Sequence, residues 1–174
     1  MMKMKLLATG MVLIVGIASV GGYSWAKGFL SAHKPESHAA KHFDSLADLA
    51  LIAMEKRAGE LKISGVAVVA YAEGDSIQGW SSKMLVVGRM KDAPTAGNNG
   101  NNLLGIAYAK AAEMADTLVD SGTSSRPPMT GEFGWQGGVI ARTKTGYVIA
   151  AFSGGKSEDD KAVSQSGIAV LKDL

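Results

Sequence analysis

All three histidines of this chain lie close together, at His33, His38 and His42. His38 and His42 are four residues apart, so on a helix their imidazoles would share one face. This spacing suits a transition metal, or a single axial ligand to haem iron. Two solvated histidines on a mobile arm would produce the same pattern. We expect His42 to be the better metal ligand, because it lies at the entrance to the first strongly predicted helix.

A second stretch with possible chemistry is Gly155-Lys156-Ser157, between a strand-like run and a helix-like run. A phosphate-binding loop would also need a glycine five residues before Gly155, and Ala150 stands there. Residues 158–160 are all acidic, and in a first helical turn they would repel a triphosphate. We therefore predict a helix start capped by Ser157 and no nucleotide site.

No hydrolytic constellation is apparent. The histidines are confined to one segment, and Gly-x-Ser-x-Gly is absent. An enzyme acting on a small organic acid would need a base in the long loop before residue 137. Glu132 is the only carboxylate between Ser121 and Arg142, so it is the candidate base.

The N-terminal segment predicts export. A short basic start precedes seventeen uncharged residues (6–22), and Ser24-Trp25-Ala26 places small residues where a signal peptidase reads. We expect residues 1–26 to be a signal peptide cleaved after Ala26, leaving an extracytoplasmic protein, periplasmic or secreted, with no stable membrane anchor. An uncleaved anchor is the alternative, since seventeen residues approach the length of a span.

Charge and cysteine content exclude several classes of protein. Cleavage would remove Lys3 and Lys5, lowering the cationic residues from 18 to 16, against 16 acidic residues. A neutral mature chain gives no electrostatic case for nucleic acid. The absence of cysteine excludes disulfides, thiolate metal sites and covalently attached c-type haem.

Hydrophobic periodicity predicts the first half of the fold. A polar arm (27–43), which could itself be helical from Glu36, leads to a helix that begins at Asp44 or Ser45. Two strands follow, at residues 66–72 and 84–90, and residues 91–102 are expected to form a loop.

The second half is predicted to repeat this order. A helix at about residues 102–119 and a long irregular loop precede two strands joined by Lys144-Thr145-Gly146, a tight hairpin. A final helix is expected at about residues 158–172. The sequence therefore predicts an α+β domain over residues 44–174.

The last 38 residues also carry a recognisable pattern: a Gly-Gly strand, a tight hairpin, a second strand ending in Ser-Gly, and a helix with an early Asp. These positions are Gly137-Gly138, Gly146, Ser153-Gly154, Asp159 or Asp160, and Gly167. Upstream, residues 66–74, Arg89-Met90-x-Asp92 and Lys110-Ala111 fit the same pattern. This region resembles the GlcG/HbpS-like family.

The resemblance implies a single profilin-like domain, with an antiparallel sheet flanked by helices. It also implies a homo-oligomer, and non-covalent binding of haem or a related tetrapyrrole by an exported protein. There are two alternatives: an enzyme or accessory protein that acts on a small organic acid, and a structural oligomer that binds no ligand. Ala112 and Glu113 replace the Arg-Thr that often follows Lys-Ala in relatives, and about six extra residues lengthen the first hairpin.

On this basis the expected haem site combines His42 and His38 with two cations. Arg89 and Lys110 could pair with haem propionates, although such residues more often form surface ion pairs. The methionines Met84, Met90 and Met114 are expected to be core filler rather than ligands. Exposed aromatic residues (Trp80, Phe133 and Trp135) could stack on a macrocycle or fill a subunit interface.

Overall fold

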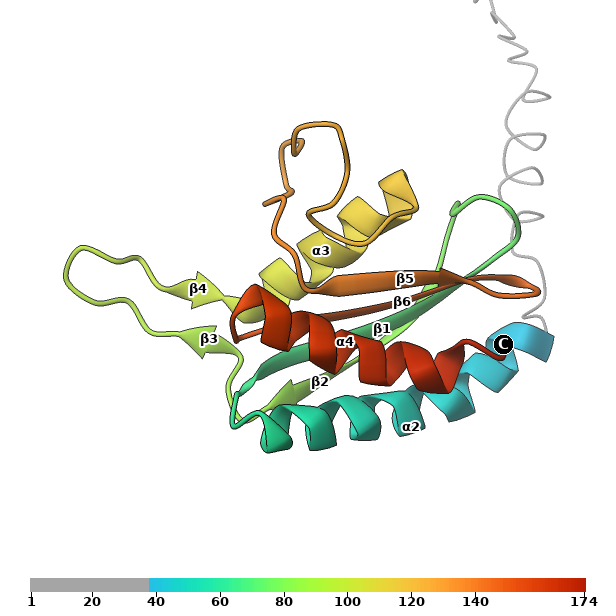
Figure 1. Ribbon diagram of the computed structural model, residues 1–174, viewed down its shortest axis with the longest axis horizontal. Coiled ribbons are helices and arrows are strands. Elements are labelled where there is room, and N and C mark those ends of the chain that lie inside the picture. Colours follow the sequence, from blue (N-terminus) through green and yellow to red (C-terminus); the bar gives the residue numbers. More distant parts are fainter. Residues whose placement is uncertain (1–37) are drawn as a thin grey trace, which may run out of the picture. The chain divides into compact units, whose positions relative to one another are not determined.

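The computed structural model describes residues 38–174, which form a four-stranded antiparallel sheet with helices on both faces (Figure 1). The strands are ordered β2-β1-β6-β5. In chain order the elements are α2 (His38–Glu60), β1 (Gly65–Glu73), β2 (Ser81–Val87), β3 (Lys91–Asp92), β4 (Asn101–Asn102), α3 (Leu103–Thr117), β5 (Gly138–Arg142), β6 (Gly146–Ser153) and α4 (Ser157–Leu171). The predicted α+β class, with an antiparallel sheet flanked by helices, is confirmed.

The two central strands, β1 and β6, are buried on both faces, which explains their almost continuous apolar runs. Alternate residues such as Val69 and Phe152 pack under α2 and α4. The residues between them, including Val68 and Ala151, pack under α3. Helices α2 and α4 therefore cover one face of the sheet and α3 covers the other, as Figure 1 shows.

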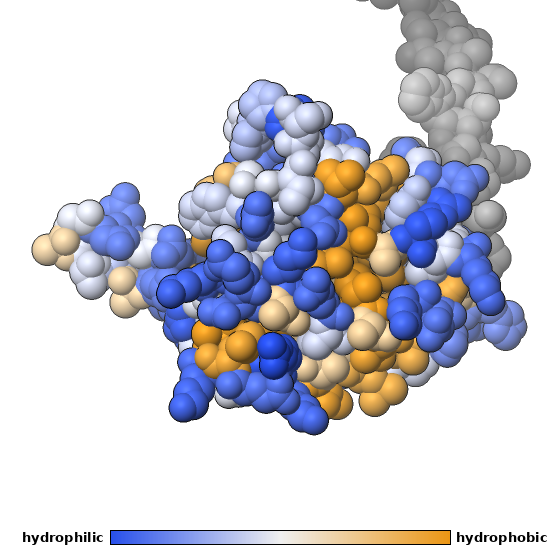
Figure 2. Space-filling model, viewed as in Figure 1, coloured by the Kyte–Doolittle hydropathy of each residue, from blue (hydrophilic) through white to orange (hydrophobic). Residues whose placement is uncertain are grey.

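The two edges of the sheet differ. The backbone N–H groups of Gly138 and Ile140, on β5, donate to the side chains of Ser121 and Asp120 at 2.8 and 3.2 Å. Figure 2 shows apolar surface (orange) along this side, where the middle of β5 is only partly buried. On the outer edge of β2, no described segment other than β1 makes a hydrogen bond with the backbone of residues 81–86. One edge is thus blunted by a loop and the other is open.

Helix α2 is longer than predicted. It begins at His38, so the expected start at Asp44 or Ser45 is wrong, and the alternative in which the end of the arm is also helical agrees with the structure. Phe43, assigned to the polar arm, is fully buried and stacks on Tyr71 with a ring-centroid distance of 5.9 Å. Ser45 does not cap the helix, because its hydroxyl donates to the His42 carbonyl within it. Burial of Phe43 anchors the first turns, and it makes residues 38–43 part of the domain.

The start of α4 also differs from the prediction. The N-cap is Lys156, which makes no side-chain capping bond, and Ser157 is already helical. Asp160 instead accepts a hydrogen bond from the Gly155 N–H at 2.8 Å. The acidic residues do lie in the first turn, as expected.

Residues 91–102, predicted as a loop, form a small β3–β4 hairpin that projects from the body of the domain (Figure 1). Its ladder pairs only Lys91 with Asn102 and Asp92 with Asn101, closed by a bridge between Thr95 and Asn98.

Candidate functional site

A cavity of about 170 Å³ lies where β6 ends and α4 begins. We call it the α4 cavity. Its polar lining comes from β3, β4, α3, the loop before β5, β6 and α4, and includes Asp92, Asn101, Lys110, Gln136, Ser153 and Asp160. Its apolar lining is Leu103, Ile106 and Trp135. Polar groups from distant parts of the chain meet here in one concave place, which is the usual arrangement of a small-molecule site.

The floor of the cavity is a buried ion pair. Lys110, on α3, donates to Asp160 Oδ2 and to the Phe152 carbonyl oxygen, both at 2.8 Å. The two side chains are only 3% and 5% exposed. Because α3 and α4 lie on opposite faces of the sheet, Lys110 reaches past the end of β6 to join them. The pair holds the floor in one arrangement.

Gly137 explains how the loop before β5 comes so close to this pair. Its backbone has φ of 128°, a region that disfavours any residue with a Cβ. A Cβ there would lie 2.6 Å from Lys110 Nζ and 2.7 Å from Asp160 Cβ. Ser164 of α4 donates to the Gly137 carbonyl at 2.6 Å, which fixes the glycine against the helix.

Ser153 adds a hydroxyl group to the lining of the cavity. The residue is 4% exposed and lines the cavity, and strand alternation from Ala151 directs its side chain to the α3 face. Within residues 38–174 its hydroxyl makes no hydrogen bond. No buried side-chain nitrogen or oxygen of the described residues lacks a hydrogen-bond partner, so the Ser153 hydroxyl is accessible from the cavity and is free to bond a ligand or water there.

The opposite wall is built around Arg89. Its guanidinium donates to Asp92 Oδ1 at 2.8 Å and to the carbonyls of Ser64 and Gly154 at 2.8 and 2.9 Å. The Asn101 amide donates to the other Asp92 oxygen at 2.9 Å. The hydrogen bonds from Asn101 and then Arg89 lower the pKa of Asp92 below its ordinary value. Asp92 is therefore an ionised acceptor at the cavity wall.

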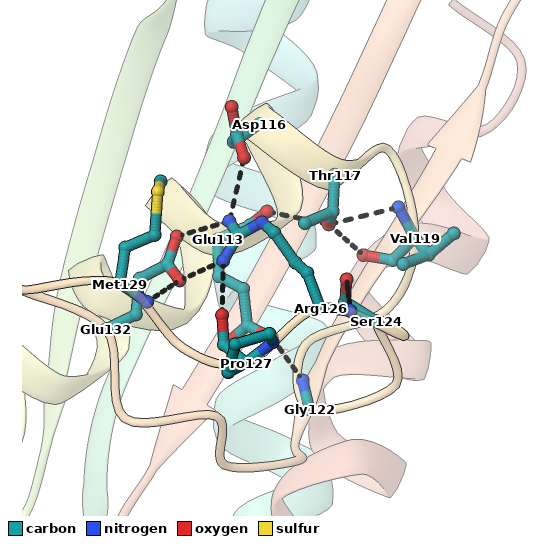
Figure 3. Close-up of polar contacts among 10 residues, drawn as sticks. All are labelled: Glu113, Asp116, Thr117, Val119, Gly122, Ser124, Arg126, Pro127, Met129 and Glu132. Atoms are coloured by element: carbon teal, nitrogen blue, oxygen red, sulfur yellow. Dashed lines mark hydrogen bonds and ion pairs between the residues drawn. The ribbon is translucent and has the colours of Figure 1, made fainter.

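The loop that supplies Trp135 and Gln136 is held by a second cluster, shown in Figure 3. Arg126 donates to both carboxylate oxygens of Glu132, each at 2.7 Å, and to Asp116 Oδ2 at 2.7 Å. Glu132 also accepts from the Met129 N–H at 2.8 Å. The Arg126 hydrogen bonds, followed by the Met129 bond, lower the pKa of Glu132 to about 2.

This cluster bears on the organic-acid enzyme that the sequence left open. A carboxylate with so low a pKa is a weak base, and its three hydrogen bonds all come from residues of the loop. Glu132 therefore acts as an anchor for the loop rather than as a general base. Glu113, buried beneath the loop, adds a further anchor by accepting from the Gly122 N–H at 2.8 Å.

The four residues predicted to bind haem do not meet in one chain. His38 and His42 are exposed on the first turns of α2, close to Phe43, which stacks on Tyr71 near the Glu73–Gly146 end of the sheet. Lys110 and Arg89 lie at the Ser153 end, about the α4 cavity. The histidines and the cations are therefore separated by the length of the sheet.

The two cations are also not free to bind propionates. Lys110 is neither exposed nor in a surface ion pair, since it is buried against Asp160. Arg89 directs its guanidinium to Asp92 and to backbone carbonyls. Among the described residues, no group of three or more metal-ligating side chains includes His42. In one chain the structure does not bring the four expected haem-site residues together, and haem binding stays a prediction.

Other predicted residues have mixed outcomes. Met114 is fully buried and Met84 packs against the core, as expected of filler, but Met90 is 46% exposed. Trp80 lines a more open hollow of about 560 Å³ between the β1–β2 loop and α3, with Ile77 and Leu118. The residues that line this hollow include no histidine or methionine. Phe133 stacks on Trp135 with centroids 4.8 Å apart.

Sequence reasoning missed several residues of the α4 cavity: Asn101, Gln136 and Ser153. Asp160 was expected only to complement the helix dipole. A Ser-Gly-Gly turn at the end of a buried strand was visible in the sequence, and ligands often bind beyond strand ends. What the sequence lacks is the close approach of Lys110, which is fifty residues from Asp160.

Comparison with models of known protein families and with curated proteins finds no match. The class of protein is therefore defined by its fold and cavity: an α+β domain with a preformed polar cavity beside a buried Lys–Asp pair. The similarity to the GlcG/HbpS-like family stays a prediction. In the part of the chain from residue 38 onward, no helix combines the length and hydropathy of a membrane span.

Proposed function

We propose that this chain is an exported protein that binds a small molecule in the α4 cavity. The observation that carries the proposal is the convergence of polar side chains from distant segments on one cavity, among them the Ser153 hydroxyl, which bonds no other described residue. The surrounding groups are already fixed by the Lys110–Asp160 and Arg89–Asp92 pairs. A site held in place before binding loses little free energy to reorganisation.

The size of the cavity limits the ligand. At about 30 Å³ per water molecule, 170 Å³ corresponds to roughly six waters, which is the volume of a small metabolite. A tetrapyrrole is several times larger and does not fit inside it. Neither nucleic acid nor a nucleotide is proposed, because acidic residues occupy the first turn of α4.

The test is a thermal-shift screen of the mature chain against small hydroxylated acids, polyols, sugars and amines. Each compound that raises the melting temperature should bind Ser153→Ala at least tenfold more weakly than the unaltered chain, or not at all, when the affinity is measured by calorimetry. Ser81→Ala is the matched control, because Ser81 is exposed on β2 and should leave affinity unchanged. If Ser81→Ala and Ser153→Ala bind a hit equally, the ligand is not in the α4 cavity.

Haem binding rests on the family resemblance, with His42 as the axial ligand. A second copy of the chain is one way to bring further haem contacts to His42. Titration of the mature chain with haem tests this directly: His42→Ala should shift the Soret band and weaken binding at least tenfold, while His33→Ala should do neither. His33 lies outside the described residues. A haem spectrum unchanged in both variants would exclude histidine ligation by His42.

The proposal includes a homo-oligomer, and the open outer edge of β2 supports it. An uncovered edge strand can pair with another strand, and here β2 carries partly exposed apolar residues such as Met84 and Val86. Sedimentation velocity of the mature chain should show an oligomer that Val86→Lys disperses. The control is Leu49→Lys, on the exposed surface of α2. A monomer at all concentrations would contradict the proposal.

Export is proposed from residues 1–26 and is tested separately. N-terminal sequencing of the protein from its native cell envelope should begin at Lys27. Recovery of the intact chain from the soluble cytoplasmic fraction would contradict export.

A further inference from the structure

The charges around the α4 cavity are already paired with one another. Its lining contains one cation, Lys110, and two anions, Asp92 and Asp160. Lys110 is bound to Asp160, and Arg89 neutralises Asp92 from outside the cavity at 2.8 Å. A negatively charged ligand would therefore meet two carboxylates and no uncommitted cation. A positively charged ligand would have to compete with Lys110 or Arg89.

The hydrogen-bonding groups that remain suit hydroxyls. Two of the three Lys110 N–H groups are used, so one remains for a ligand. The carboxylates of Asp92 and Asp160 can only accept, and each oxygen has capacity beyond its existing bond. Ser153 and Gln136 can both donate and accept. A hydroxyl group, which donates and accepts at once, satisfies such a mixed lining better than a carboxylate, which only accepts.

The cavity also has an apolar side at its mouth. Trp135 lines it while remaining 47% exposed, and Phe133 stacks against the same ring. A neighbouring hollow of about 320 Å³ shares Asn101, Ile106 and Trp135 with the cavity. A sugar ring has one face of C–H groups that can be buried on an aromatic ring while its hydroxyls reach polar side chains.

From these observations we infer that the ligand of the α4 cavity is an uncharged, hydroxyl-rich small molecule, a sugar or polyol, rather than an organic acid. The inference rests on the proposed small-molecule site and specifies the class of its ligand. In this arrangement Asp92, Asp160 and Ser153 bond the hydroxyls, and Trp135 covers the apolar face of the ring.

Matched probes separate the classes by charge while keeping the skeleton similar. The mature chain is titrated by calorimetry with glycerol and glycerate, and with D-glucose, D-gluconate and D-glucosamine; D-xylose and erythritol extend the neutral set. At least one neutral compound should bind, and should bind at least tenfold more tightly than its charged counterpart. Binding of the acids alone, or of glucosamine alone, overturns the hydroxyl-rich class while leaving a small-molecule site in place.

Two pairs of variants locate the binding. Trp135→Ala should lower the affinity for the neutral compound at least tenfold. Trp80→Ala, which changes an exposed tryptophan in the hollow between the β1–β2 loop and α3, should leave the affinity unchanged. Gln136→Ala should likewise weaken it, and Gln165→Ala, on the exposed surface of α4, should not. Equal effects of Trp135→Ala and Trp80→Ala overturn the assignment to this cavity. If no compound of any charge binds, both this inference and the proposed function fail.

Discussion

Removal of the Lys110 charge should cost the domain several kcal/mol of folding free energy. The Lys110→Met substitution keeps an unbranched apolar stem, but it leaves the Asp160 carboxylate buried without its cation, and the Phe152 carbonyl without its donor. Breaking one partner of a buried pair costs about 3–5 kcal/mol. Asp160 keeps its bond from the Gly155 N–H and lies in the first turn of α4, so we expect a value near the lower end, about 3 kcal/mol.

A double-mutant cycle measures how much of this cost is the stranded charge. Asp160→Asn removes the charge while keeping an oxygen that can accept from Gly155. The Lys110→Met/Asp160→Asn double variant should therefore be less destabilised than the sum of the single variants by about 2 kcal/mol. Urea denaturation, followed by circular dichroism, gives the change in the free energy of unfolding for each of the three variants, with the same dependence on urea concentration assumed for all.

The control for this cycle is Lys161→Met. Lys161 lies on α4, next to Asp160, and pairs with Asp120 at 3.1 Å, but the two side chains are 38% and 28% exposed. A pair of this kind contributes about 0–1 kcal/mol. Additive effects of Lys110→Met and Asp160→Asn, or a cost no larger than that of Lys161→Met, would refute the structural role given to the buried pair.

Three further predictions concern the surroundings of the cavity. Because the pKa of Glu132 is lowered to about 2, its ion pair stabilises the loop fully above the ordinary pKa of 4.5, and this stabilisation is lost as the pH falls toward 2. Limited proteolysis of the loop should therefore increase over this pH range, and Glu132→Gln should abolish the pH dependence. Gly137→Ala should lower the free energy of unfolding, measured in urea, by about 1–3 kcal/mol. The loss should exceed that of Gly131→Ala, because Gly131 also has a positive φ but has open space around it. Equal losses would mean that backbone strain alone matters. Ser157→Ala should change stability by less than about 0.5 kcal/mol, because Ser157 does not cap α4; a loss near 1 kcal/mol would restore it as the cap.

Strands β1, β5 and β6 and the last two helices could be predicted because local pattern and tertiary packing agree there, whereas β2 runs over Ser81–Val87, three residues earlier than the predicted 84–90. Asn102 caps α3 through its side chain, which accepts from the Gly105 N–H at 3.0 Å, so the helix begins where the sequence indicated. The hairpin around Lys144-Thr145-Gly146 joins β5 and β6 as expected. In both places the turn residues and the periodicity favour the same boundary.

The start of α2 was mispredicted because two local signals competed. Asp44 and Ser45 have side chains that commonly cap helices, and the histidines before them looked polar. Packing of Phe43 into the core outweighs the capping preference and extends the helix by a turn and a half toward His38. A single buried aromatic residue in a polar segment carries little weight in a periodicity argument.

The cavity could not be predicted because its geometry is tertiary. Lys110 was expected either to pair with a haem propionate or to form a surface ion pair, and nothing in its neighbours indicates that it passes the end of β6. Ser153 looked like the last residue of a strand. Only the order β2-β1-β6-β5, which places β6 between α3 and α4, makes these side chains neighbours.

The buried Lys110–Asp160 pair also restricts how the sequence can change over generations. A substitution at Lys110 alone, or at Asp160 alone, leaves the other charge buried without its partner. The two positions, fifty residues apart, must therefore change together or not at all. Asn101, Trp135 and Gln136 are exposed at the rim and carry no such constraint. A lineage of such proteins can therefore acquire new ligands by successive single substitutions at the rim, while the floor beneath them is inherited unchanged.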